Sequence, residues 1–137
     1  NGWSGWYKGW FFRSLRELSF MVNVIERFGF KWKTGESRRY MISYIDYNGE
    51  KRNYFPDFIL NDKYMVECKP KALHNTSMVM AKSDAANEFC ISKGMKYKMM
   101  SSGSLTDEEI MNLYVSGSIV FTPRYEAKFA KRYLNND

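Results

Sequence analysis

Two carboxylates and a lysine lie close together in the middle of the chain. Asp57 follows Pro56 directly, and Glu67 and Lys69 stand on either side of Cys68 a short distance further on. Carboxylate oxygens suit a hard cation such as Mg²⁺, which usually keeps several waters and also binds substrate phosphate oxygens. A cation held in this way activates water and stabilises charge that develops on phosphorus. These residue types therefore indicate metal-assisted attack of water on a phosphate, with the lysine orienting the water or neutralising charge.

Two adjacent strands must position these side chains. Residues 54–60 and 63–70 predict the strands, and Asn61-Asp62 between them suits a hairpin turn. Alternate side chains of a strand share a face, so Glu67 and the lysine two residues later point to the same side. The hairpin brings Asp57 back beside them. The alternative is a charged hairpin whose carboxylates lie in solvent.

The motif formed by Pro56-Asp57 and Glu67-Cys68-Lys69 resembles the PD-(D/E)XK signature of the restriction-endonuclease-like nuclease superfamily. This resemblance extends to Glu17, which is similar to the extra carboxylate in the first helix of three groups. These groups are phage junction-resolving endonucleases, phage homing endonucleases and the endonuclease subunit of heteromeric transposases. The resemblance implies a DNA endonuclease that depends on Mg²⁺ or Mn²⁺.

The resemblance also implies a role for each site residue. Asp57 and Glu67 bind one or two divalent cations, with the backbone carbonyl of Cys68 as a further ligand. Lys69 assists the nucleophile, and Glu17 completes a second metal site or positions the water. Capping its own helix is the other role open to Glu17, because Ser14 is a suitable N-cap residue three positions before it.

Six cationic or titratable side chains are candidates for contact with DNA phosphates. A solvated surface position is the alternative for Arg13, Arg16 and Lys82, and a solvated loop position is the alternative for His74. The candidates are Lys8, Arg13, Arg16, Lys71, His74 and Lys82.

Charge and composition agree with a nucleic-acid partner. The chain has 137 residues, a formal net charge of +6 and 45% hydrophobic residues, which predicts a single folded domain with a polyanionic partner. No apolar run approaches the roughly 18 residues that span a bilayer, so no membrane contact is expected. Cys68 and Cys90 lack the close Cys or His neighbours of a zinc site. We expect reduced thiols, a core position for Cys68, and the cytoplasm of a bacterial or phage-infected cell.

The order of predicted elements is typical of an α/β fold with a mixed central sheet flanked by helices, as in the restriction-endonuclease-like core. An aromatic N-terminal arm (1–12) and a basic, helical C-terminal tail (122–137) flank it. Predicted helices cover 13–28, 77–92 and a segment starting at Thr106, and predicted strands cover 30–34, 39–47, 51–60, 63–69, 95–100 and 119–121.

Three biological roles fit a nuclease of this kind. A phage homing or nicking enzyme is the first choice because of the aromatic arm, and a transposase-type subunit that cleaves DNA ends is another. A Holliday-junction resolvase predicts a homodimer, because resolvases usually act as dimers. An inactive DNA-binding module and an RNA-directed nuclease are further alternatives. The sequence does not distinguish a nick from a double-strand break.

Overall fold

A computed structural model of the chain describes residues 2–74 and 76–134, without the side chain of Lys71. The chain divides into two compact units, one of residues Asn1–Asn23 and Gly103–Asp137, the other of Val24–Ser102. Each unit is described by itself, and the single nuclease domain stays a prediction. None of the described helices is long and apolar enough to cross a membrane.

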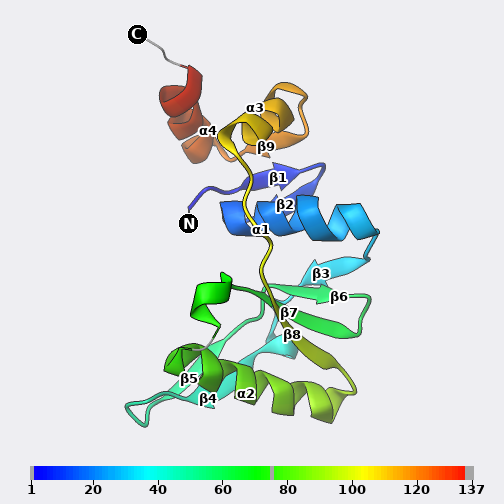
Figure 1. The fold of residues 1–137 in the computed structure, drawn as a ribbon, viewed down its shortest axis with the longest axis vertical. Helices are drawn as coiled ribbons and strands as arrows, with labels where there is room; N and C mark the ends of the chain where they lie inside the picture. Colours follow the sequence, from blue (N-terminus) through cyan, green and yellow to red (C-terminus); the bar gives the residue numbers. More distant parts are fainter. Residues whose placement is uncertain (1, 75, 135–137) are drawn as a thin grey trace. The chain divides into compact units, whose positions relative to one another are not determined.

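A mixed four-stranded sheet forms the centre of the second unit (Figure 1). The sheet has the order β3-β6-β7-β8, in which β3–β6 and β6–β7 are antiparallel and β7–β8 are parallel. This arrangement confirms the predicted α/β class with a mixed central sheet. The strands are β3 (Trp32–Thr34), β6 (Phe58–Leu60), β7 (Tyr64–Cys68) and β8 (Lys96–Met100).

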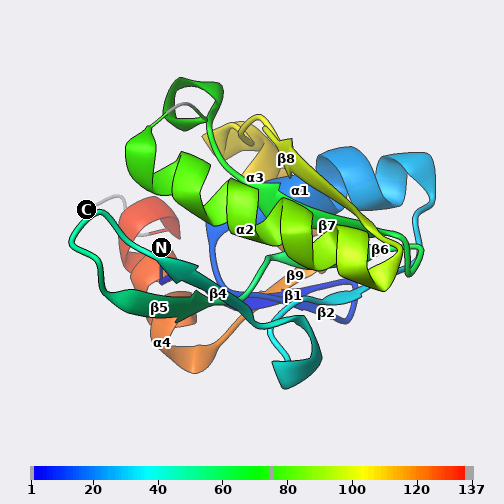
Figure 2. The ribbon, with the colours of Figure 1, turned by 90° about the horizontal axis from the view of Figure 1, so that it is seen from below.

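The helix α2 (Ser77–Lys93) covers one face of this sheet (Figure 2). The Thr76 hydroxyl caps its N-terminus, and Gly94 ends it in the left-handed conformation that glycine adopts without strain. Ala86 and Cys90 of the helix are buried against Ile59 and Met65 of the sheet, and the Cys90 and Met65 sulfurs are 3.7 Å apart.

Alternation along β7 divides its side chains between two faces, as the sequence predicts. Met65 points to the α2 side and is fully buried. Glu67 therefore emerges on the α2 side, at the end of the strand, and Lys69 follows it on the same face. Cys68 is also buried, on the opposite face, which confirms its predicted core position.

The hairpin of β4 (Ile42–Ile45) and β5 (Lys51–Tyr54) forms a separate two-stranded sheet that lies along α2. The prediction of one continuous strand over 51–60 is wrong, because the chain leaves β5 at Tyr54 and joins the central sheet only at Phe58. Pro56 lies between the two strands, where its ring removes a backbone donor and favours a break in the ladder. The predicted strand 39–47 begins later, after the 3₁₀ helix η2 (Arg38–Tyr40).

The first unit contains a three-stranded antiparallel sheet of order β2-β1-β9. Its strands are β1 (Gly5–Tyr7), β2 (Trp10–Phe12) and β9 (Ile119–Phe121), so the stretch predicted as an aromatic arm contains a β-hairpin. Strand β9 lies so close to Gly5 that an added Cβ would stand 2.5 Å from the carbonyl oxygen of Val120. Only glycine fits this crossing without a shift of the backbone.

The first unit also contains helices, and side-chain caps mark the start of two of them. Ser14 caps the first of them, as the sequence predicts, and Thr106 with Glu109 forms a complete capping box. The predicted basic tail is helical over Pro123–Leu134. The helices of this unit are α1 (Leu15–Phe20), α3 (Asp107–Val115), and α4 (Pro123–Phe129), which the π-helix η4 (Ala130–Leu134) continues. The π-helix η1 (Met21–Glu26) continues α1 and ends within the second unit.

Gly5→Ala should lower the thermal midpoint of unfolding, because the new methyl group would press on the backbone of β9. Overpacking of this kind costs about 1–3 kcal/mol. Differential scanning calorimetry measures the shift. Asn112→Ala, at an exposed position of α3, is the matched control and should leave the midpoint almost unchanged. Equal midpoints for both variants would contradict the close packing of β1 on β9.

Candidate active site

Asp57 lies where β6 meets the end of β7, and two hydrogen bonds hold it there. Its backbone N–H donates to the Val66 carbonyl over 3.1 Å, and its carboxylate oxygen Oδ2 accepts from the backbone N–H of Cys68 over 2.7 Å. Val66 and Cys68 are the two neighbours of Glu67 in the chain. The structure therefore places Asp57 beside Glu67, as the predicted hairpin requires.

Gly35 supports this position of Asp57 from the neighbouring chain segment. Its N–H donates to the carbonyl of Asp57 over 3.2 Å. A Cβ at Gly35 would lie 2.3 Å from the carbonyl oxygen of Pro56 and 2.7 Å from the proline ring. The backbone of Gly35 therefore packs closely against Pro56, and this close approach holds the chain between β5 and β6 in place.

Two tyrosines lie next to Glu67 on the α2 side of the sheet. Tyr97 pairs with Met65 in the β7–β8 ladder, so it shares the face of Glu67, and its phenol oxygen is buried. Burial first, and then the charges of Glu67 and Asp57, raise the pKa of Tyr97. Burial and the neighbouring Tyr97 and Glu67 likewise raise the pKa of Tyr54. Both phenols therefore stay neutral and able to donate hydrogen bonds beside the carboxylates.

The segment after β7 is anchored on both sides of Lys69. The Lys69 N–H donates to the Met100 carbonyl over 3.0 Å, which extends the parallel ladder by one residue. The Lys69 carbonyl lies 2.8 Å from Nε2 of His74. A carbonyl only accepts, so Nε2 carries the proton. His74 therefore orders the turn after the motif, and its predicted contact with DNA stays a prediction.

Comparison with known proteins agrees with this geometry. The model of the family described as TnsA-like endonuclease N terminal matches residues 23–102, more than half of the chain. The chain belongs to this family. TnsA-like endonucleases are restriction-endonuclease-like, PD-(D/E)XK proteins, so the match confirms the resemblance to a transposase endonuclease subunit. Searches among curated proteins and among solved structures found no match.

The family match coincides with one structural unit. Residues 23–102 differ by a single residue at one end from the compact unit Val24–Ser102. This TnsA-like unit contains Asp57, Glu67 and Lys69 on one sheet. Membership of an endonuclease family implies DNA as the substrate.

The donor chemistry of the site fits a divalent cation. Among residues 2–74 and 76–134, no group of three His, Cys, Asp or Glu side chains is arranged to hold a metal. Mg²⁺ commonly uses only one or two carboxylates, with waters and substrate phosphates completing its shell. The adjacent Asp57 and Glu67 carboxylates provide such a pair, and the Cys68 carbonyl as a further ligand stays a prediction.

Glu17 belongs to the other unit of the chain and caps α1. Its N–H donates to the Ser14 hydroxyl, and its carboxylate oxygen Oε1 accepts from the N–H of Arg13 over 3.1 Å. This arrangement confirms the N-cap that the sequence predicts. The catalytic role of Glu17 stays a prediction that follows from the resemblance.

Lys82 of α2 lies against the β4–β5 hairpin. Its ammonium group is 5.3 Å from the ring centre of Tyr54 and 5.8 Å from that of Tyr44. The Tyr54 phenol donates to the Lys82 carbonyl over 3.1 Å. These contacts hold the half-buried lysine in place, and its contact with DNA stays a prediction.

The other predicted DNA contacts have varied surroundings in the structure. Lys8 is exposed at the β1–β2 turn, with a left-handed φ of 48° and its ammonium group 5.3 Å from the Tyr7 ring. Arg13 and Arg16 are exposed near the start of α1. The side chain of Lys71 lies outside the described residues.

Sequence reasoning missed Gly35, Tyr54 and Tyr97 as neighbours of the site. A glycine in a turn gives no local sign that it will contact Pro56, which is distant in the chain. Tyr97 belongs to β8, which pairs with β7, and Tyr54 belongs to β5, whose hairpin packs along α2. Both arrangements depend on tertiary structure. No local pattern identifies which face of a strand will meet Glu67.

Gly35→Ala adds only one methyl group, but it should displace the segment that carries Asp57. The new methyl group would clash with the Pro56 backbone, and the strain of about 1–3 kcal/mol falls on the segment that carries Asp57. We expect a lower thermal midpoint and weaker Mg²⁺ binding, measured by isothermal titration calorimetry. Ser37→Ala in the same turn is the control. Unchanged Mg²⁺ affinity in a folded Gly35→Ala protein would contradict this role.

Tyr97→Phe should reduce the loss of stability at alkaline pH. The folded state raises the pKa of Tyr97 above its ordinary value of 10.0. The contribution of Tyr97 to the free energy of unfolding is thus complete below about pH 10, and it is lost as the pH rises through the pKa of Tyr97 in the folded state. Thermal midpoints between about pH 8 and about pH 11 measure the loss, which Tyr97→Phe should diminish. Tyr47→Phe, at an exposed tyrosine, should leave it unchanged. Equal effects of both substitutions would refute the assignment.

Proposed function

We propose that this TnsA-like protein is a divalent-metal-dependent DNA endonuclease that cleaves DNA as part of a transposase. The family match supports the transposase role over a phage homing enzyme. The observation that carries the metal-dependent chemistry is the hydrogen bond from the Cys68 N–H to Asp57, because it holds Asp57 beside Glu67 at a strand end.

Asp57 and Glu67 together hold the cation in this proposal. A bound Mg²⁺ or Mn²⁺ supplies positive charge that stabilises the pentacovalent phosphorus and lowers the pKa of water. The chain orients this pair through backbone hydrogen bonds of β6 and β7. Because the β6–β7 ladder ends at Val66, the two carboxylates lie at the end of the sheet, where a phosphate group can approach them in this proposal.

Lys69 acts on the nucleophile. It follows Glu67 on the same face of the chain, which supports a role in which its ammonium group orients the attacking water and neutralises charge on the phosphate. His74 restrains the backbone carbonyl of Lys69. Hydrolysis then leaves a 5′-phosphate, as the resemblance implies.

Cationic side chains of both units provide further contacts to the DNA backbone in this proposal. Phosphate contacts contribute most of the non-specific affinity and position the duplex for cleavage. Glu17 adds a carboxylate to the cation site or positions the water. The proposed contacts are Lys8, Arg13, Arg16, Lys71, His74 and Lys82.

Glu67→Gln should abolish metal-dependent cleavage while leaving the fold intact. The substitution keeps the shape of the side chain but removes the charge that binds the cation. Cleavage of supercoiled plasmid with Mg²⁺ should fall by at least about a hundredfold, since a metal supplies several kcal/mol to the transition state. Glu50→Gln, an exposed carboxylate of the β4–β5 hairpin, should cleave like the parent protein.

The same assay separates the rival roles. Transposon-end duplexes, a four-way junction and random plasmid are compared with Mg²⁺, Mn²⁺ and EDTA. Preference for transposon ends supports the transposase role, whereas preference for the junction by a homodimer supports a resolvase. Binding of DNA without cleavage of any substrate would favour the binding-module alternative, and cleavage that persists in EDTA would refute the metal-dependent mechanism.

A further inference from the structure

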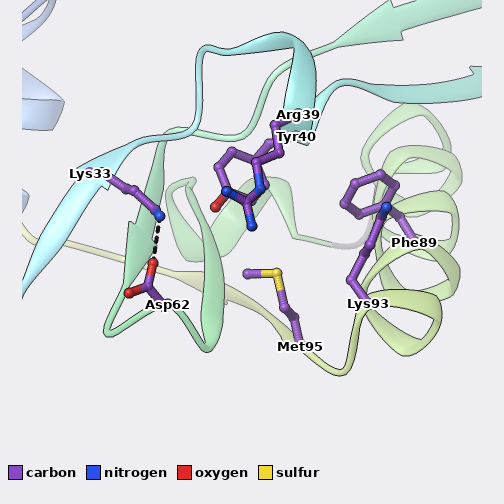
Figure 3. Close-up of a pocket in the computed structure, with 7 residues that line it drawn as sticks. All are labelled: Lys33, Arg39, Tyr40, Asp62, Phe89, Lys93 and Met95. Carbon is purple, nitrogen blue, oxygen red and sulfur yellow. Dashed lines mark ion pairs between the residues drawn. The ribbon is translucent and has the colours of Figure 1, made fainter.

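A basic pocket lies at the turn end of the central sheet, within the TnsA-like unit. It has a volume of about 420 Å³ and contains three cationic side chains and one carboxylate, with Tyr40 and Phe89 among its walls (Figure 3). The charged groups come from β3, from η2, from the β6–β7 turn and from the end of α2. They are Lys33, Arg39, Asp62 and Lys93.

The charges of this basic pocket do not cancel. The Lys33 ammonium group is 2.5 Å from Oδ1 of Asp62, and this contact is the dashed ion pair in Figure 3. Within the described part of the chain, neither Arg39 nor Lys93 forms an ion pair. The pKa of Asp62 is lowered first by Lys33 and further by the charges of Arg39 and Lys31, so positive charge surrounds the single carboxylate.

Aromatic rings hold the cations of the pocket in place. The Arg39 guanidinium carbon is 5.6 Å from the centre of the buried Tyr40 ring, and the Lys33 ammonium group is 5.8 Å from the same ring. The Lys93 ammonium group is 5.7 Å from the Phe89 ring. Cations restrained over aromatic faces lose less conformational freedom when they bind an anion.

Further lysines come to the same end of the sheet through backbone hydrogen bonds. Lys31 exchanges two bonds with Asn61 of the turn, and the Lys96 N–H donates to the Lys63 carbonyl. Lys31, Lys63 and Lys96 are all exposed. The basic pocket therefore opens on a strongly positive surface, which suits a polyanion better than an isolated small anion.

The basic pocket and the proposed cleavage site lie at opposite ends of one strand, β7. Asp62 lies in the turn that leads into β7, and Glu67 is near the end of that strand, so at most about 17 Å separates them at about 3.3 Å per residue. Phosphates of one DNA strand are spaced about 3.4 Å apart along the helix axis. The same rigid sheet can therefore contact a duplex at the cleaved bond and at a second phosphate within about five base pairs of it.

We propose that this basic pocket binds a backbone phosphate of the DNA substrate, within about five base pairs of the cleaved bond. The inference rests on the proposed function, because it takes the Asp57–Glu67 site as the point of cleavage. Arg39 and Lys93 make the contact, since their charges are not compensated. Asp62 weakens the contact by holding Lys33 and by repelling the phosphate.

Arg39→Gln and Lys93→Gln should weaken binding and reduce its dependence on salt. Each phosphate contact contributes about 0.9 to the slope of log affinity against log salt, so each variant should lose about 0.9 and the double variant about 1.8. Fluorescence anisotropy of a labelled duplex in EDTA measures the slope without cleavage. Lys51→Gln, on the β4–β5 hairpin, removes the same charge away from the pocket and should retain the slope of the parent protein.

Asp62→Asn should have the opposite effect and bind DNA more tightly. Asparagine tolerates the left-handed backbone of this position, where φ is 55°, so the turn is retained. The substitution releases Lys33 from its ion pair and removes the repulsive charge. A gain of affinity cannot result from misfolding, so this variant makes the test independent of the stability of the glutamine variants.

Phosphate ethylation interference locates the contact on DNA. The parent protein should be sensitive to ethylation of a phosphate within about five base pairs of the cleaved bond. The double variant should lose this sensitivity and keep the sensitivity to ethylation at the cleaved bond. Unchanged slopes in Arg39→Gln and Lys93→Gln, with unchanged affinity in Asp62→Asn, would overturn the proposal. An acidic protein partner would then become the expected occupant.

The outcomes for the pocket and for the proposed function are distinguishable. Metal-dependent cleavage with unchanged slopes in the pocket variants rejects the phosphate contact and leaves the endonuclease intact. Reduced slopes without cleavage retain the contact and reject the endonuclease. A parent protein that neither binds nor cleaves DNA rejects both.

Discussion

A single side-chain hydrogen bond completes the central sheet at its functional end. Where β6 and β7 separate, the N–H of Cys68 would lose its ladder partner, and the Asp57 carboxylate accepts it instead. Burial of an unpaired N–H is costly, so this bond stabilises both the end of the strand and the position of the acid. Pro56 and Gly35 enforce the break that makes it possible, and the location of Glu67 beside Asp57 follows from the same geometry.

Charge in the TnsA-like unit is concentrated at the two ends of one rigid sheet. Acidic groups gather where β7 ends, and cationic groups gather at the turn where it begins. The core between them is apolar and fully buried, with α2 across one face. A packed interior deforms little, so the spacing between the two ends is constant. For a nuclease this rigidity fixes the distance between the scissile phosphate and a second point of contact.

Aromatic residues perform different tasks in the two units. In the first unit Trp3, Phe121 and Phe129 belong to a cluster of stacked and edge-on rings that joins β9 to α4. In the second unit, tyrosines surround charged groups: Tyr97 beside Glu67, and Tyr40 under Arg39. Tyrosine suits such positions because most of its side chain is apolar and its hydroxyl end is polar.

The sequence by itself determined the fold class, the strand that carries Glu67 and Lys69, the caps at Ser14 and Thr106, and the endonuclease family. These features depend on residues close together in the chain, so alternation, turn residues and a short motif express them. Tertiary structure alone decided the contact between Gly35 and Pro56, the tyrosines beside Glu67 and the basic pocket. Each of these depends on strand register or on helix packing between distant segments. Local sequence does not encode either of them, because one residue of slip moves every side chain to the opposite face.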